Sequence, residues 1–153
     1  MVAYRSRQYA FENRLAATVL LGSIALLAVL FTVAGAWSQA PWLCGGTIVL
    51  LAGLLFVTLT VTVDEEAVRV SLARIMRRDV ALTDIRSVER RDYHPVREFG
   101  GWGLRWAFDR RATAYTTSGT SAVVLALADG SELYLGVDDE PGLIDAVRSR
   151  IEA

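Results

Sequence analysis

Hydrophobic and polar positions divide the chain into two unlike parts. Leu15 to Val63 contains no Asp, Glu, Lys or Arg in 49 consecutive positions. From Asp64 onward, short apolar runs alternate with polar positions, and 16 of the 17 acidic residues lie in this part. An uncharged stretch of that length is not found in a soluble globule. We therefore predict a membrane-embedded first part and a water-soluble second part.

The uncharged run is too long for one membrane crossing, because about 20 helical residues span the hydrocarbon core. Residues 38–41 form a polar break that ends in proline, and Trp37 and Trp42 flank it. Tryptophan favours the membrane interface, so both rings are expected there. The pattern predicts a transmembrane helical hairpin, with helices at about 15–37 and 42–57.

The last six residues of the uncharged run have a spacing of apolar positions that differs from that of a helix. Thr58 to Val63 alternates strictly and is rich in β-branched residues, which is typical of a strand. We therefore expect three segments: a cytoplasmic N-terminal segment at 1–14, the two transmembrane helices within 15–57, and a folded cytoplasmic domain at 58–153.

The flanking basic residues predict the orientation of the hairpin. Three arginines precede the first helix, none lies in the connection, and four follow the second helix between Arg69 and Arg78. Under the positive-inside rule both termini are cytoplasmic. A secretory signal cleaved after Ala34-Gly35-Ala36 is the alternative, but its apolar stretch is longer than a signal needs and a second apolar segment follows at once.

The second part reads as up to seven short strands followed by a helix. Asp129-Gly130 supplies the positive φ angles of a tight hairpin turn. Asp138 or Asp139 can cap a helix that has Pro141 in its first turn. The fold class is therefore membrane α+β, with an antiparallel β-barrel or sandwich capped by a C-terminal helix. The expected strands are 58–63 paired with 67–72, then 85–90, 104–108 paired with 112–116, and 122–127 paired with 132–135.

Several motifs carry a family resemblance. They are the two apolar spans with a strand after the second, the segment Val80 to Val88, the run Gly100-Gly101-Trp102-Gly103-Leu104-Arg105, the Gly119 turn and the Asp129-Gly130 hairpin. Together they resemble bacterial membrane proteins with a cytoplasmic pleckstrin-homology-like (PH-like) domain. The resemblance implies a PH-like fold and a multi-pass protein of the bacterial inner membrane. Because members of this group mostly lack an assigned activity, it implies little about function.

The net charge and the reactive residue types argue against several classes of function. The formal net charge is −1, and the arginines are interleaved with acids, so a nucleic-acid interface is not expected. The chain has one cysteine, Cys44, and one histidine, His94. No spacing of residues is typical of a metal site, a nucleophile with its base or a phosphate-binding loop. We expect no catalytic residue, no metal and no cofactor.

Two sets of residues are candidates for recognition. Arginine and tryptophan dominate interface hot spots and arginine can hold carboxylate or phosphate with two hydrogen bonds, so one set is expected to bind a partner. A second set follows the membrane part closely enough to touch anionic lipid. The acidic first turn, Asp64 to Glu66, would repel a phosphoinositide headgroup, so specific binding of that lipid is not expected. The partner-binding set is Arg97, Trp102, Arg105, Trp106, Arg110 and Arg111, and the lipid-surface set is Arg74, Arg77 and Arg78.

Three function hypotheses follow. The leading one is a non-enzymatic inner-membrane protein whose PH-like domain binds another protein, or a second copy of itself, as a scaffold at the cytoplasmic face. The alternative is a module that senses the anionic lipid surface. The third is an enzyme of unknown type, which would need a deep pocket with convergent polar groups around His94.

Overall fold

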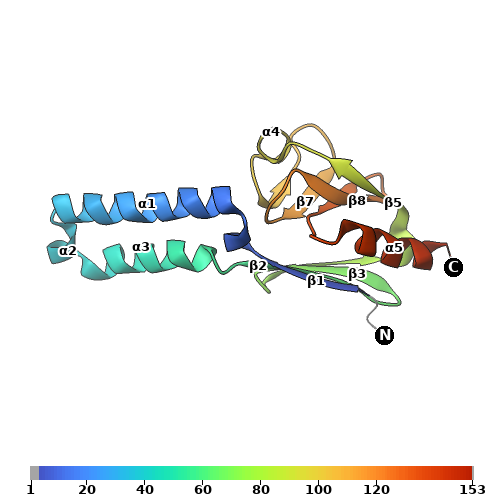
Figure 1. Ribbon diagram of the computed structural model, residues 1–153, viewed down its shortest axis with the longest axis horizontal. Helices are drawn as coiled ribbons and strands as arrows, with labels where there is room; N and C mark the ends of the chain where they lie inside the picture. Colours follow the sequence, from blue (N-terminus) through green and yellow to red (C-terminus); the bar gives the residue numbers. More distant parts are fainter. Residues whose placement is uncertain (1–3, 153) are drawn as a thin grey trace. The chain divides into compact units, whose positions relative to one another are not determined.

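The computed structural model describes residues 4–152 and divides into two compact units (Figure 1). Tyr9–Val57 forms the helical unit. The N-terminal residues up to Gln8, together with the chain from Thr58 onward, form the sheet unit.

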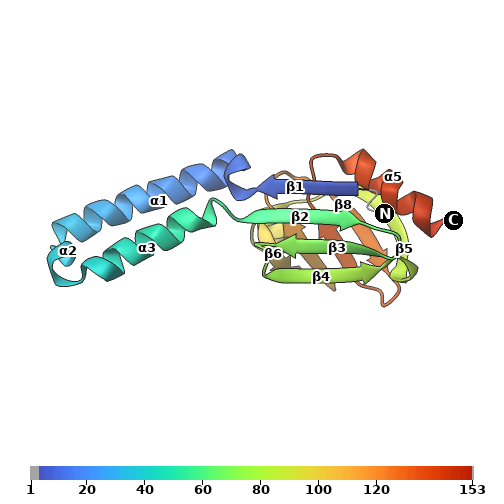
Figure 2. The ribbon, with the colours of Figure 1, turned by 90° about the horizontal axis from the view of Figure 1, so that it is seen from below.

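The helical unit consists of α1 (Arg14–Val33), the short α2 (Ala36–Gln39) and α3 (Pro41–Leu54). Asn13 caps α1, because its side chain accepts a hydrogen bond of 3.0 Å from the backbone N–H of Ala16. Gly35 separates α1 from α2 with a left-handed φ of 65°. Within this unit α1 and α3 pack side by side, as the views in Figures 1 and 2 agree.

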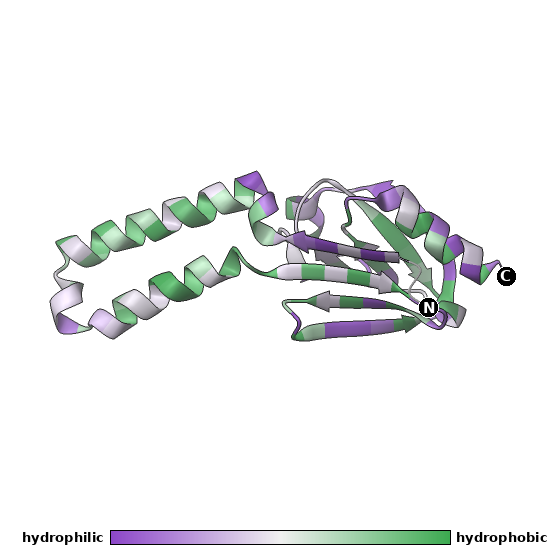
Figure 3. Ribbon diagram, turned by 60° about the horizontal axis from the view of Figure 1, so that its bottom comes forward, coloured by the Kyte–Doolittle hydropathy of each residue, from purple (hydrophilic) through white to green (hydrophobic). Residues whose placement is uncertain are grey.

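The two helices differ in length from the predicted hairpin. Among the described residues, α1 alone is both long and apolar enough to cross a membrane, and the 14 residues of α3 cover only about 21 Å. Figure 3 shows that both helices are apolar over most of their length. The predicted ends at 37 and 57 were too late. Gly35 breaks the first helix, and the chain leaves the second helix three residues before the strand that begins at Thr58.

The first sheet of the sheet unit has the order β1-β2-β3-β4. Its strands are β1 (Tyr4–Tyr9), β2 (Thr58–Val63), β3 (Ala67–Leu72) and β4 (Met76–Ala81). The predicted hairpin of β2 and β3 is confirmed, with Val61 opposite Val70. Strand β1 is a finding that the sequence did not predict, because residues 1–14 were expected to be a separate N-terminal segment.

The second sheet has the order β5-β8-β9-β7-β6. Its strands are β5 (Ile85–Asp92), β6 (Gly103–Trp106), β7 (Ala112–Thr116), β8 (Ser121–Leu127) and β9 (Glu132–Leu135). The predicted hairpins of β6 with β7 and of β8 with β9 are confirmed. Strands β7 and β9 pair in parallel, so the expectation of a wholly antiparallel domain was wrong at this pair. β7 and β9 are parallel because β8, which lies between them in the sequence, pairs with β9 on the side away from β7.

The core follows from the alternation of buried positions along the strands. Val61 and Val70 of the first sheet and Leu125 and Leu133 of the second are at most 1% exposed. The second sheet also buries its other face, where a small cluster centred on Tyr134 lies with Phe99 from α4 (Pro95–Phe99). This double burial explains why β8 reads as a continuous apolar run.

The predicted C-terminal helix is confirmed as α5 (Glu140–Ile151). Asp139 caps it, and its side chain accepts a hydrogen bond of 3.0 Å from the N–H of Gly142. Leu143 and Val147 of α5 are fully buried, and the helix contacts β5, β8 and β2. The structure is therefore α+β, with two mainly antiparallel sheets and a C-terminal helix.

Candidate anion-binding face

The outer face of the first sheet is unusually rich in arginine. A strand exposes every second residue on one face, so burial of Val68 and Val70 in β3 turns Arg69 and Ser71 outward. The same alternation turns Arg5 and Arg7 outward in β1. In Figure 2 this sheet lies in front of the second one.

These outward side chains line one hollow of about 370 Å³. Thr60, Ser71 and Arg77 are direct neighbours in a row across β2, β3 and β4. Arg69 lies opposite Asp79 in another row. Five arginines, two hydroxyl groups and one carboxylate thus line the hollow. We name its arginines, Arg5, Arg7, Arg69, Arg74 and Arg77, the arginine face.

Within residues 4–152, some of these arginines have protein partners and others do not. Arg69 forms an ion pair of 3.0 Å with Asp64, and two backbone N–H groups that bond Asp64 hold the pKa of its carboxyl below the usual value. Arg77 donates through Nε to the carbonyl oxygen of Arg74 at 3.3 Å. Within residues 4–152, the side chains of Arg5 and Arg74 have no hydrogen bond or ion pair. Guanidinium groups that share one face repel each other, and an anion with several acceptor oxygens would offset that repulsion.

The structure splits the predicted lipid-surface set. Arg74 and Arg77 belong to the arginine face, whereas Arg78 points to the opposite side of β4 and donates to Thr113 Oγ1 at 3.4 Å. The period of two along a strand causes this separation. The sequence pattern did not predict that Arg5, Arg7 and Arg69 belong to this face. The alternation of Tyr4 to Tyr9 was the available signal for the first two.

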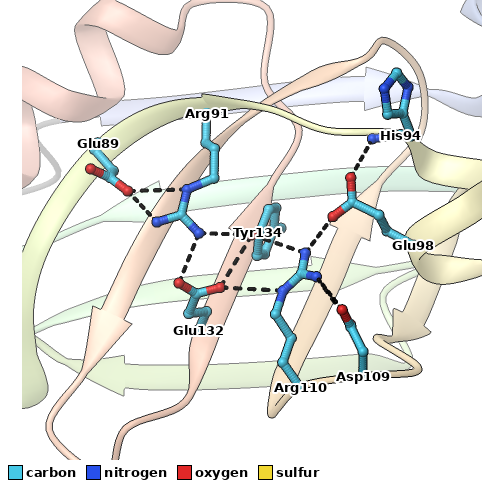
Figure 4. Close-up of polar contacts among 8 residues, drawn as sticks. All are labelled: Glu89, Arg91, His94, Glu98, Asp109, Arg110, Glu132 and Tyr134. Carbon is cyan, nitrogen blue, oxygen red and sulfur yellow. Dashed lines mark hydrogen bonds and ion pairs between the residues drawn. The ribbon is translucent and has the colours of Figure 1, made fainter.

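The structure also separates the members of the predicted partner-binding set. The side chain of Arg110 is packed against its neighbours in the sheet unit and is 31% exposed. Its guanidinium forms ion pairs with Glu98 at 2.5 Å and Asp109 at 3.0 Å (Figure 4). It also lies 5.5 Å from the ring centres of both Phe99 and Tyr134. Burial lowers the pKa of Arg110, but the bonds from Glu98 and Tyr134 outweigh it and raise the pKa overall. These contacts give Arg110 a structural role.

Arg91 completes this network from the neighbouring side. Its Nη1 donates to Glu132 at 2.8 Å and to the Tyr134 hydroxyl at 3.0 Å, and Glu89 also pairs with it. The pKa of Arg91 is raised, first by Glu132 and then by Glu89. Figure 4 shows the Tyr134 hydroxyl between the two guanidinium groups. This buried tyrosine connects three charged side chains, Arg91 of β5, Glu132 of β9 and Arg110 of the loop before β7.

The remaining members of the partner-binding set lie in different surroundings. Trp102 donates through Nε1 to the carbonyl oxygen of Gly119 at 3.0 Å, and Arg105 donates through Nε to the carbonyl oxygen of Trp102 at 3.2 Å. Both contacts hold the glycine-rich segment in place. Arg111 makes a long contact of 3.5 Å with the carbonyl oxygen of Asp129. Arg97 is exposed on α4, and Trp106 is 65% exposed on β6.

The residues with catalytic potential are scattered. Cys44 is buried in α3. His94 borders a shallow hollow with Arg97, Glu98, Phe108 and Asp109, where its backbone N–H donates to Glu98 at 2.7 Å. In residues 4–152, no group of three or more His, Cys, Asp or Glu side chains is arranged to hold a metal ion. The predicted interface residues Trp37 and Trp42 are on α2 and α3, 38% and 75% exposed.

Comparisons of the chain with protein-family models, with curated proteins and with solved structures found no match.

Proposed function

We propose that this protein is a non-enzymatic membrane protein whose sheet unit binds anionic, phosphate-bearing lipid headgroups through the arginine face. The observation that carries the proposal is one hollow that is lined by five arginines and one carboxylate. Phosphate oxygens accept bidentate hydrogen bonds from guanidinium groups, and the hydroxyls of Thr60 and Ser71 add further donors.

The topology supports a helical hairpin that crosses the bilayer twice. Strand β1 precedes α1 and strand β2 follows α3, yet the two strands are neighbours in one sheet. A single crossing would put β1 and β2 on opposite sides of the membrane and break that sheet. If the apolar segment crosses the bilayer, it therefore crosses an even number of times, and its two helices allow two crossings. Because α3 is short, we expect α2 and residues 55–57 to complete its span, with local thinning of the bilayer.

The arginine distribution supports a cytoplasmic location for both termini. Arg5 and Arg7 precede the helices, Arg14 is the first residue of α1, and Arg69 to Arg78 follow the helices. A cleaved secretory signal fits poorly, since it would remove β1. Gln8 of β1 contacts both Thr117 and Asp138 in the sheet unit. With the resemblance to bacterial PH-like membrane proteins, these points favour a multi-pass protein of the bacterial inner membrane. Two sheets with a C-terminal helix support the PH-like fold, and the parallel pair β7 and β9 departs from it.

The experiment measures lipid binding to the full chain purified in detergent, by native mass spectrometry during titration with phosphatidylglycerol or phosphatidylcholine. The test variant combines Arg5→Gln, Arg74→Gln and Arg77→Gln. One arginine near an anionic surface contributes about 1 kcal/mol, so this variant is expected to bind phosphatidylglycerol roughly 100-fold more weakly.

The matched control removes the same charge elsewhere, at the exposed residues Arg86, Arg97 and Arg148. We expect it to bind phosphatidylglycerol within about threefold of the wild type. Glycerol phosphate in solution tests whether a free phosphate ester competes with the lipid. Equal losses in the two triple variants, or equal binding of both lipids by the wild type, would overturn the proposal.

Protein binding stays a second candidate because of one observation. Trp106 is 65% exposed and Phe108 is 76% exposed, only two residues apart. Large aromatic side chains are enriched at interface centres. A photo-crosslinking residue at Trp106 should capture one discrete partner in native membranes, and the same residue at Ser87 should capture none. Identical adducts from both positions would contradict this candidate.

A further inference from the structure

The turn between β3 and β4 exposes apolar side chains in a constrained conformation. Ile75 is 83% exposed and Met76 is 49% exposed. Ala73 and Arg74 have left-handed φ angles of 54° and 60°, which L-residues other than glycine rarely adopt. The N–H of Ile75 closes the turn on the carbonyl oxygen of Leu72 at 3.2 Å. The chain thus keeps a strained turn whose tip presents an isoleucine to solvent.

This turn lies at the end of the first sheet where the chain arrives from α3. The N–H of Ala73 donates to the carbonyl oxygen of Thr58 at 2.8 Å, and Leu72 pairs with Leu59. Three residues, 55–57, connect Thr58 to the last residue of α3. The turn is therefore fixed beside the point where the sheet unit is covalently tied to the apolar helices.

The opposite end of the same sheet is acidic, whereas the end with this turn is basic and apolar. There the turn between β2 and β3 is Asp64-Glu65-Glu66, which is acidic. At the helix-linked end, Arg74 and Arg77 flank Ile75 and Met76. Basic residues around an apolar tip suit an anionic membrane surface, where acyl chains accept the tip and phosphates accept the guanidinium groups. An acidic turn suits the end that faces away from that surface.

We propose that Ile75 and Met76 insert into the interfacial layer of the same bilayer that holds α1 and α3, with Arg74 and Arg77 bonded to lipid phosphates. This inference rests on the proposed function, because it requires the helices to span the bilayer. The turn acts as a second attachment point, and it fixes which end of the arginine face meets the headgroups.

The experiment places a spin label at position 75 of the full chain in lipid nanodiscs. Cys44→Ala removes the one native cysteine, and Ile75→Cys introduces the labelled site. Val96→Cys and Phe108→Cys are matched controls, since these residues are also exposed and apolar, at 64% and 76%, but lie outside the turn. Collision of the label with oxygen, which concentrates in the bilayer, is compared with collision with a polar nickel chelate.

The expected result is an oxygen-to-nickel accessibility ratio at position 75 at least severalfold above that at positions 96 and 108. Apolar insertion should persist in phosphatidylcholine nanodiscs and deepen when phosphatidylglycerol is added. A ratio at position 75 equal to the control ratios would overturn the inference. Protection of position 75 from both reagents would also overturn it, because that result indicates burial against a second protein chain.

The outcomes separate this inference from the proposed function. If position 75 stays aqueous while the arginine-face variant loses phosphatidylglycerol binding, the insertion is refuted and the proposed function stands. If position 75 inserts but the arginine-face variant binds phosphatidylglycerol like the wild type, the insertion stands and headgroup binding by the arginine face is refuted.

Discussion

The hydroxyl of Tyr134 offers a clean test of the charged network in the sheet unit. Tyr134 is 1% exposed, and its hydroxyl accepts hydrogen bonds from Arg91 at 3.0 Å and from Arg110 at 3.2 Å. It also donates to Glu132 at 3.1 Å. Tyr134→Phe deletes these three contacts and leaves the ring in place, so the effect isolates the hydroxyl.

The magnitude follows from the contacts that remain. A hydrogen bond to a charged group contributes about 1.5–3 kcal/mol. Because Arg91 and Arg110 keep their carboxylate partners, we expect a loss equal to about one such bond, or about 2 kcal/mol. For a domain of this size that corresponds to a fall in Tm of about 10 °C.

Tyr93 provides the matched control in the same aromatic cluster. It is 3% exposed, and its ring lies 5.7 Å from that of Tyr134. Within residues 4–152 its hydroxyl has no hydrogen bond of acceptable geometry. Burial raises the pKa of Tyr93, and the nearby Thr116 hydroxyl opposes that rise. Tyr93→Phe is expected to be neutral or stabilising, because it removes a buried polar group without a good partner.

The assay is thermal unfolding of the full chain in detergent at pH 7, followed by near-UV circular dichroism. Tyr134→Phe should lower the Tm and Tyr93→Phe should not. If the two variants unfold within about 2 °C of each other, the hydrogen bonds of Tyr134 do not stabilise the fold and the reasoning is refuted.

Two further predictions use the same unfolding assay. Burial raises the pKa of Glu98, but the bonds from the His94 N–H and from Arg110 outweigh it and hold the pKa below 4.5; its stabilisation is therefore present above pH 4.5 and lost as pH falls further. Glu98→Gln should lower the Tm at pH 7, and the difference from wild type should shrink as the pH falls below the usual pKa of a glutamate. A difference that is constant with pH would contradict this sign. A Cβ at Gly136 would lie 3.1 Å from the side chain of buried Thr116. Gly136→Ala should therefore lower the free energy of unfolding by about 1–3 kcal/mol. An unchanged Tm would contradict this prediction and show that the site can relax.

Local signals predicted the hairpins and the last helix. Strict alternation identified β2 and β3, and Asp129-Gly130 identified the turn between β8 and β9. The acidic cap and Pro141 identified the start of α5. In each case the residues that determine the element lie within one short segment, so their spacing is sufficient.

The candidate site was less predictable, because its parts are distant in sequence. Arg74 and Arg77 were expected near lipid. Arg5 and Arg7 lie on the same face because β1 pairs with β2, although the whole helical unit separates these two strands in the sequence. Arg110 was expected to bind a partner, and the sequence did not predict its bonds to Glu98 and Tyr134 within the domain. Composition alone does not distinguish an arginine that binds a ligand from one that completes a network.

The sequence by itself determined that an uncharged, apolar segment precedes a small α+β domain, since hydrophobic periodicity and turn residues act locally. The tertiary structure decided that the N-terminal strand belongs to the same sheet as the strand after the helices. It also decided which arginines share a face, because strand order and register set which side chains lie side by side. Both features depend on pairing between segments some 50 residues apart, and such pairing is selected by the packing of the whole domain.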